Sequence, residues 1–89
     1  MAVSKKLQTL IEQDNQYLFQ NYGTRLPACF IKGKGSELFD QDGKRYIDFF
    51  AGIAVNSLGY NHPALNSTLH KQIDAIMHSS NWFFNKQQI

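Results

Sequence analysis

Hydrophobic and polar residues alternate with a helical period at the start of the chain. Between residues 4 and 22, apolar side chains recur near the helical period with Lys, Glu and Gln between them, which is typical of an amphipathic helix. Ser4 stands where an N-cap is expected, and Gly23 stands where a C′ glycine would end the helix. The sequence therefore predicts a helix over residues 4–22. Its apolar positions are Leu7, Leu10, Ile11, Tyr17 and Leu18.

Three short β-strands are predicted after this helix. The segments ACFIK (28–32), ELFD (37–40) and RYIDFF (45–50) contain β-branched and aromatic residues, which favour strands. The segments GKGS and QDGK separate them, and the pair Asp42-Gly43 is a strong hairpin signal. We therefore expect a small antiparallel meander.

A second amphipathic helix is predicted over residues 63–78. Pro63 is tolerated at the first helical position, and His62 before it is expected to help cap the helix. The tail SSNWFFNKQQI contains the only Trp and two Phe residues, and it ends at Ile89 with no further chain to cover them. We therefore expect Ile89 to be a truncation point, unless the tail packs on the meander or on a second copy. The apolar stripe of the helix is Leu65, Leu69, Ile73 and Ile76.

The segment between the meander and the second helix, FFAGIAVNSLGYNHP (49–63), fits neither regular structure. It is too rich in small residues and glycine for a core strand, it has no helical stripe, and it is too apolar for an ordinary exposed loop. Small residues let a ligand or another backbone approach closely. We expect the loop 51–62 to line a cleft. The alternative is a buried connector that packs the second helix on the meander.

The element order gives an α+β fold. We divide the chain into a helical arm (1–22), a β-meander (23–50) and a segment with the loop, helix and aromatic tail (51–89). A chain of 89 residues buries only roughly 60% of its unfolded surface. It is therefore one small domain at most, or a piece of a larger one.

Charge and cysteine content exclude several classes of protein. The net charge is +2 and the nine basic residues are scattered, unlike the basic face of a nucleic-acid-binding protein. A binder that uses Lys32, Lys34, Lys44 and Arg45 stays a minor alternative. With Cys29 as the only cysteine, no internal disulfide can form, which suits a reducing compartment. The sequence has no signal-peptide pattern and no membrane-span pattern, so we expect a soluble, cytoplasmic protein.

Motifs of other chemistries are incomplete. GKGS lacks the following helix that a phosphate-binding loop requires. His62, His70 and His78 lack the i, i+4 spacing of a helical metal pair, so no metal is expected. Ser57 and Cys29 lack the surroundings of a nucleophile. The seven lysines lie in polar or turn contexts, whereas a Schiff-base lysine must be desolvated. We therefore expect no catalytic residue on this chain.

The segment GKGSELFDQDGKRYIDFFAGIAVNSLGYNHPAL resembles the N-terminal region of class III aminotransferases, and most closely their acetylornithine group. The family pattern GxGxxxxDxxGxxYxDFxxGIAVxxLGHxHP is present almost throughout, and HSSNWFFNKQQ is similar to the family segment HxSNLYYNxxQ. The matching residues are Gly33, Gly35, Asp40, Gly43, Tyr46, Asp48, Phe49, Gly52, Ile53, Ala54, Val55, Asn56, Leu58, Gly59, His62 and Pro63.

This resemblance implies part of the small lobe of a homodimeric enzyme of fold type I that uses pyridoxal 5′-phosphate (PLP). Such an enzyme moves an amino group from N-acetylornithine to 2-oxoglutarate in arginine biosynthesis. Its Schiff-base lysine, pyridinium-pairing aspartate, phosphate loop and carboxylate-binding arginine are expected beyond Ile89. The resemblance thus implies PLP, an amino acid and a 2-oxo acid as ligands of the full-length protein. We expect that these 89 residues alone neither bind PLP specifically nor transaminate.

The resemblance also implies that the loop lines the substrate pocket, with the aromatic tail on the other side. The expected pocket residues are Gly52, Ile53, Ala54, Asn56 and Phe84. Within the loop, Val55 and Asn56 would support the turn. Phe84 matches a position whose tyrosine contacts substrate in ornithine-handling relatives, and Tyr60 stands where a histidine is common. No cofactor-binding or metal-binding residue is expected on this chain.

Two further hypotheses stay open. One is a stand-alone dimerisation or binding module built from the same hairpin. The other is a class III aminotransferase with a different donor, namely ornithine, succinylornithine or 4-aminobutyrate, because the discriminating arginines are expected downstream.

Overall fold

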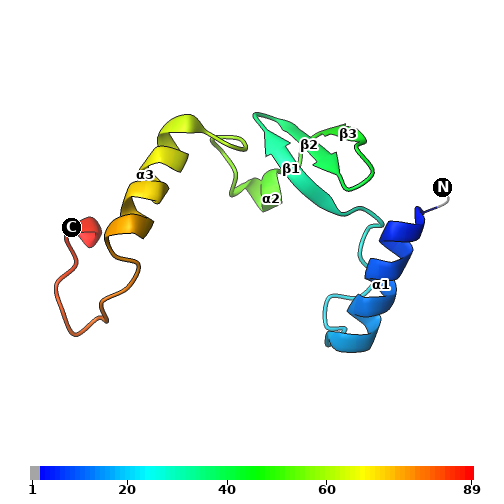
Figure 1. Cartoon of the computed structure of the whole chain (residues 1–89), viewed down its shortest axis with the longest axis horizontal. Coiled ribbons are helices and arrows are strands. Elements are labelled where there is room, and N and C mark those ends of the chain that lie inside the picture. Colours follow the sequence, from blue (N-terminus) through cyan, green and yellow to red (C-terminus); the bar gives the residue numbers. More distant parts are fainter. Residues whose placement is uncertain (1–2) are drawn as a thin grey trace.

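The structure is a computed structural model that describes residues 3–89. Its three strands form one antiparallel sheet in the order β1-β2-β3, with a helix on each side along the chain (Figure 1). This confirms the predicted order of helix, meander and helix. The elements are α1 (Lys5–Tyr17), β1 (Phe30–Lys34), β2 (Glu37–Asp40), β3 (Arg45–Ile47), α2 (Ala51–Ala54), α3 (Pro63–Ala75) and the 3-10 turn η1 (Lys86–Gln88).

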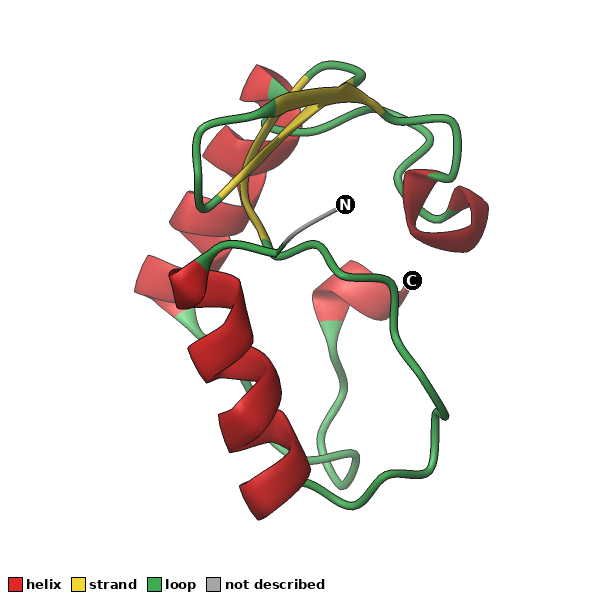
Figure 2. Cartoon of the chain, turned by 90° about the vertical axis from the view of Figure 1, so that its right-hand side faces the viewer, coloured by secondary structure: helices red, strands yellow, loops and turns green. Residues whose placement is uncertain are grey.

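The chain forms an open arch rather than a closed globule (Figure 1). Its radius of gyration is 17.6 Å, whereas a compact chain of this length has about 12 Å. Its accessible surface is 8393 Å², against about 5,300 Å² for a compact protein of this mass. Among residues 3–89, neighbouring strands are the only elements that pack on each other. Figure 2 shows the helices and the sheet joined by long segments without regular structure.

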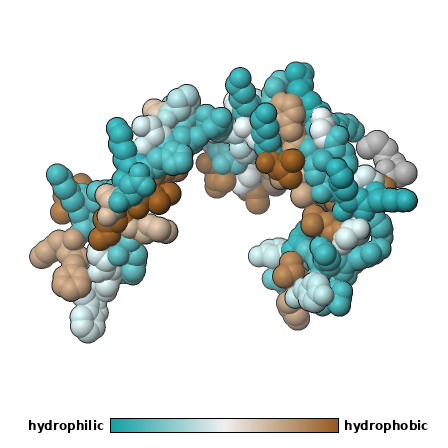
Figure 3. Space-filling view, in the orientation of Figure 1, coloured by the Kyte–Doolittle hydropathy of each residue, from teal (hydrophilic) through white to brown (hydrophobic). Residues whose placement is uncertain are grey.

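Apolar side chains are therefore left exposed. Leu7, 8% exposed, is the only buried apolar residue among those described. On α3, Leu65, Leu69 and Ile73 are 43%, 51% and 57% exposed. Hydrophobic residues gather along the concave side of the arch, below α3 and α2 (Figure 3). In a stable soluble protein, an apolar face of this extent is covered by another surface.

Helix α1 begins as predicted and ends earlier than predicted. The Ser4 hydroxyl accepts a hydrogen bond from the backbone N–H of Leu7 at 3.2 Å, which is the expected N-cap. The helix stops at Tyr17 instead of residue 22, so the prediction that Gly23 ends it is wrong. Gly23 lies in the following loop, with φ 68°.

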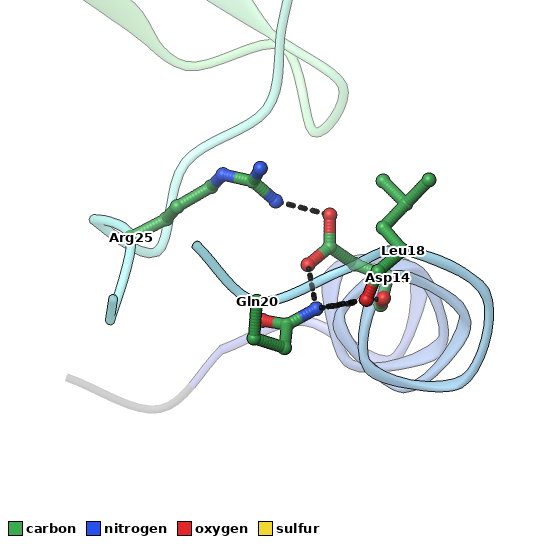
Figure 4. A network of polar contacts seen from close by, with 4 residues as sticks. All are labelled: Asp14, Leu18, Gln20 and Arg25. Carbon is green, nitrogen blue, oxygen red and sulfur yellow. Dashed lines mark hydrogen bonds and ion pairs between the residues drawn. The ribbon is translucent and has the colours of Figure 1, made fainter. Parts of the chain in front are cut away.

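Polar side chains explain this early end (Figure 4). The Gln20 amide donates to the carbonyl oxygens of Asp14 and Leu18, both at 2.9 Å, and to the Asp14 carboxylate at 3.1 Å. Arg25 pairs with the same carboxylate. The last carbonyls of a helix have no intrahelical donors. Here the Gln20 amide supplies one to Leu18 and adds a second donor to the Asp14 carbonyl, which also accepts the N–H of Leu18.

Strand β1 is displaced from the predicted range 28–32. Gly33 pairs with Leu38 and Lys34 pairs with Glu37 in the ladder, so two residues of the expected GKGS turn belong to the strand. The connection to β2 shrinks to Gly35-Ser36. This shift places Gly33 inside the sheet, where the absence of a side chain leaves room for the Tyr60 ring.

Strand β3 and helix α3 both end earlier than predicted. Strand β3 ends at residue 47, three residues before the end of the predicted range 45–50, because the Asp48 carboxylate accepts the backbone N–H groups of Phe50 and Ala51 and turns the chain away. Helix α3 ends at residue 75 instead of 78. The Gln72 amide donates to the carbonyl of Ile76 at 2.7 Å. At its start, the His62 ring accepts from the N–H of Leu65 at 3.4 Å, as expected of a cap.

Candidate functional site

The segment expected to line a cleft contains a left-handed turn, α2. All four residues of Ala51–Ala54 have positive φ, at 49°, 58°, 66° and 62°. The ψ values of Gly52 and Ile53 are 38° and 51°, which is the left-handed α region. For a β-branched residue such as Ile53 this conformation is a genuine outlier. The expectation that this segment has no regular structure is therefore corrected: it holds one turn of unusual hand.

Backbone hydrogen bonds close the turn. The N–H groups of Ile53 and Ala54 donate to the carbonyl of Phe50 at 3.0 and 3.1 Å, and the N–H of Asn56 donates to the carbonyl of Ala51 at 3.0 Å. A left-handed conformation costs roughly 1–2 kcal/mol for each residue that is not glycine. Such strain persists only where surrounding interactions fix it, and it is concentrated at functional sites.

The side chain of Asp48 and that of Tyr60 fix the two ends of the turn. One Asp48 oxygen accepts the N–H groups of Phe50 and Ala51 at 2.8 and 2.9 Å. The other accepts the Tyr60 hydroxyl at 2.6 Å. The Asn56 amide donates to the same hydroxyl at 3.2 Å. We call Asp48, Asn56 and Tyr60 the Asp48 network.

Tyr60 is in turn attached to the sheet. Its N–H donates to the carbonyl of Gly35 at 2.8 Å, and its carbonyl accepts from the N–H of Gly35 at 2.9 Å. Its ring lies over Gly33, where an added Cβ would stand 2.5 Å from the Tyr60 Cγ. Only glycine fits at this position, so the strand register and the place of the ring depend on each other.

These hydrogen bonds set the ionisation of the network. The bond from Tyr60, helped by the N–H groups of Ala51 and Phe50, holds the pKa of Asp48 below its ordinary value. The same bond raises the pKa of Tyr60. At neutral pH the carboxylate is therefore charged and the phenol is protonated, which is the pairing that the geometry requires.

A second network of the same design lies at the β2–β3 hairpin. One oxygen of Asp40 accepts the N–H groups of Asp42 and Lys44 at 3.0 and 2.9 Å, and the other accepts the Tyr46 hydroxyl at 2.9 Å. Burial raises the pKa of Asp40, but these hydrogen bonds outweigh it and the pKa is lowered. This Asp40 network holds a hairpin and touches none of the expected pocket residues.

The pocket residues expected from the sequence lie in two places. Gly52, Ile53 and Ala54 are exposed on the turn, with Ile53 76% exposed, and Asn56 beside them is half-buried. Phe84 is fully exposed in the tail, next to a cavity of about 280 Å³ at the end of α3. The tail lies at the other end of α3 from the turn (Figure 1). The described chain brings the first four together and leaves Phe84 apart, and their role as a pocket stays a prediction.

The lysines of this chain do not fit a Schiff base with PLP. All seven lysines are exposed, whereas an amine that forms a Schiff base must be desolvated. Residues 3–89 contain no cluster of three His, Cys, Asp or Glu side chains that could hold a metal ion. None of the described helices is long and apolar enough to cross a membrane.

Comparison with known proteins identifies the family. Residues 18–89 match the model of the family "Aminotransferase class-III", so the chain belongs to the class III aminotransferases, as the sequence pattern indicated. The acetylornithine aminotransferase of Caldanaerobacter subterraneus subsp. tengcongensis is 44% identical over 80 residues, which are 90% of this chain and 20% of that protein. The acetylornithine/succinyldiaminopimelate aminotransferase of Buchnera aphidicola subsp. Acyrthosiphon pisum is 51% identical over 85 residues, 94% of this chain and 20% of the relative.

Solved structures agree with this assignment. The acetylornithine aminotransferase of Elizabethkingia anophelis superimposes with a TM-score of 0.85 at 28% identity, over 93% of this chain and 20% of that one. The ornithine aminotransferase of Toxoplasma gondii gives 0.83 at 32% identity, over 93% and 19%. The chain thus has the fold of a part of these enzymes. It spans about a fifth of the length of the relatives it matches.

Sequence reasoning named Asp48 and Tyr60 as motif positions and gave neither a structural role. Asp48 carries a readable signal, because an aspartate two and three residues before free N–H groups is the spacing of an Asx turn. Tyr60 carries none, since its hydroxyl reaches a partner 12 residues away.

The ionisation of Asp48 leads to a pH prediction. A lowered pKa stabilises the fold above the ordinary aspartate pKa, and this contribution is lost as the pH falls through the lowered value. The full-length protein should therefore be more stable than its Asp48→Asn variant at pH 7, and the difference should shrink below about pH 4. Thermal unfolding of both proteins between pH 3 and 7 measures this; a difference that is independent of pH contradicts it.

Proposed function

We propose that this chain is the N-terminal segment of a PLP-dependent aminotransferase that moves an amino group from N-acetylornithine to 2-oxoglutarate, in arginine biosynthesis. The family match over residues 18–89 carries the proposal. The names of the relatives in Caldanaerobacter and Elizabethkingia support the donor. A Toxoplasma gondii relative is described with PLP at its active site. PLP acts in such enzymes as an electron sink, and we expect the residues that hold it elsewhere in the full-length protein.

In this proposal the left-handed turn lines the substrate side of the active site. Gly52 and Ala54 leave room for a ligand to approach the backbone, and the side chain of Ile53 supplies an apolar contact that excludes water. Asn56 supports the turn through Tyr60. Phe84 has no hydroxyl, so it would shape the pocket by packing alone. The 89 residues by themselves are expected to be inactive.

The exposed apolar face supports a homodimer as part of the proposal. The surface of the chain exceeds that of a compact protein of its mass by about 3,000 Å². We expect the rest of the full-length protein and a second subunit to cover it. We also expect a cytoplasmic location, which suits the unpaired Cys29.

A second donor is favoured by the relatives. The two Buchnera proteins and one from Yersinia pestis are named acetylornithine/succinyldiaminopimelate aminotransferase, and they are 51%, 58% and 56% identical to this chain. Both donors carry an acylated amino group, so one pocket can accept both. Succinyldiaminopimelate is therefore the second candidate, ahead of ornithine and 4-aminobutyrate.

The test uses the endogenous full-length protein. Its intact mass should correspond to several lengths of roughly 150 residues. Purified with PLP, it is assayed for glutamate formation from 2-oxoglutarate with each of the five donors, namely N-acetylornithine, succinyldiaminopimelate, succinylornithine, ornithine and 4-aminobutyrate. We expect the acylated donors to have kcat/KM at least about tenfold above ornithine and 4-aminobutyrate. A protein no longer than this segment, or one that forms no glutamate with any donor, would favour the stand-alone binding module instead.

A further inference from the structure

The left-handed turn cannot be held by its own sequence. Of its four residues only Gly52 tolerates positive φ without strain, and Ile53 is strongly opposed to it. The turn also exposes rather than buries its largest side chain, since Ile53 is 76% exposed. Hydrophobic burial within the described residues therefore does not stabilise it, and polar contacts at its ends must do so.

These contacts form a continuous path from the sheet to the turn. Tyr60 is fixed at the end of β1 by two backbone hydrogen bonds to Gly35, just after the strand, and by the contact of its ring with Gly33 in the strand. From there its hydroxyl reaches both ends of the turn at once. It donates to Asp48, which holds the entry, and it accepts from Asn56, which follows the exit.

We propose that Tyr60 and Asp48 are positioning residues for amino-donor recognition: they hold the left-handed turn so that Ile53 stands at a fixed place against the donor. This inference rests on the proposed function, because it takes the turn as a wall of the substrate site. Neither side chain has to touch the donor. Their effect passes through the backbone of residues 50–56.

This arrangement makes donor affinity sensitive to a single hydroxyl. Without the Tyr60 hydroxyl, the ring still covers Gly33 and the backbone bonds to Gly35 are unchanged. Asp48 loses one partner and Asn56 loses its acceptor, so the turn can relax toward the right-handed conformations that Ala51 and Ile53 prefer. Each relaxed conformer moves Ile53, and the fraction of protein with a correctly shaped site falls.

The Asp40 network provides a matched control within the same chain. Tyr46→Phe removes a phenol hydroxyl from an aspartate that also bonds two backbone N–H groups, as Tyr60→Phe does. The ring of Tyr46 packs edge-on against Phe30 with centroids 5.2 Å apart, and phenylalanine keeps this contact. The two variants therefore share their chemistry and differ in what the network holds.

The experiment compares Tyr60→Phe, Asp48→Asn, the double variant and Tyr46→Phe in the full-length protein. We expect Tyr60→Phe and Asp48→Asn each to raise the KM for N-acetylornithine by about three- to tenfold with little change in kcat. The double variant should be no worse than the worse single one, because both changes break one network. Tyr46→Phe should lose about as much thermal stability as Tyr60→Phe, but its KM for N-acetylornithine should be unchanged. Equal KM effects of Tyr60→Phe and Tyr46→Phe, or full additivity in the double variant, would overturn the proposal.

Hydrogen–deuterium exchange gives a readout that does not depend on activity. The N–H groups of Ile53, Ala54 and Asn56 are bonded within the turn. We expect them to exchange about tenfold faster in Tyr60→Phe than in wild type, with no change in Tyr46→Phe. Unchanged exchange in Tyr60→Phe shows that the hydroxyl does not hold the turn, which refutes this inference alone. Faster exchange in a protein that transfers no amino group refutes the proposed function, and with it the donor-recognition role, and leaves only the support of the turn.

Discussion

The Gly33→Ala variant of the full-length protein is expected to be less stable than wild type by about 1–3 kcal/mol, the usual cost of overpacking. A Cβ at this position would lie 2.5 Å from Cγ and 2.6 Å from Cβ of Tyr60. The backbone N–H and C=O of Tyr60 are both hydrogen-bonded to Gly35. The Cβ and Cγ atoms of Tyr60 therefore cannot move away from residue 33 by a side-chain rotation. Either the ladder or the Tyr60 contact must open. Urea unfolding of both proteins measures the difference.

The clash can be separated from other effects of the substitution by removing its partner. In a Tyr60→Gly background, alanine at residue 33 no longer meets the side-chain atoms that stand closest to it. We expect the cost of Gly33→Ala to fall by most of its value there, although Tyr60→Gly is itself destabilising. If Gly33→Ala costs the same in both backgrounds, the Tyr60 ring is not what requires glycine at this position.

Helix starts and strand existence were predicted well, because local chemistry decides them. Ser4 caps α1 through its own hydroxyl, and the Asp42-Gly43 pair marks the hairpin between β2 and β3. Helix and strand ends were predicted poorly. Gln20 ends α1 and Asp48 ends β3 through side-chain hydrogen bonds. The Asx-turn spacing of Asp48 can be recognised in the sequence, whereas residue propensities do not indicate the bonds that Gln20 makes.

The left-handed turn is the feature that the residue pattern could not give. Periodicity identifies right-handed helices and strands, and three of the four residues Ala-Gly-Ile-Ala favour right-handed conformations. In our proposal the handedness depends on the hydrogen bond from Tyr60 to Asp48, and therefore on the sheet that places Tyr60. Sequence reasoning saw that the segment was unusual, and this was the correct signal. What it lacked was the long-range contact that explains the anomaly.

In the candidate site, too, the sequence indicated which residues matter, and the structure was needed to show their conformation. Ile53 and its neighbours were selected through resemblance to a family, and the structure adds that they occupy a strained turn on a rigid support. Phe84 was expected on the other side of the same pocket. Within the described residues it lies beyond α3 from the turn (Figure 1), and its role in the pocket stays a prediction.

The Gly52→Ala variant of the full-length protein is expected to lower kcat/KM for the amino donor by about tenfold or more. An added Cβ would stand 2.9 Å from the Asn56 amide nitrogen and 3.1 Å from a methyl carbon of Val55. The amide would be pushed off the Tyr60 hydroxyl, and the turn would lose the bond at its exit. Steady-state kinetics with N-acetylornithine and 2-oxoglutarate measure the effect.

Gly43→Ala is the matched control, because it separates backbone strain from the displaced contact. Gly43 has φ 83° and nothing within 4 Å of an added Cβ, whereas Gly52 has φ 58° and two close neighbours. Both variants carry the left-handed cost of alanine, roughly 1–2 kcal/mol, so both should lose stability. Only Gly52→Ala should lose more activity than its lower stability explains. If the two variants lose activity in proportion to stability alone, the turn is a structural connector. If Gly52→Ala alone is impaired, residues 51–54 belong to the substrate site.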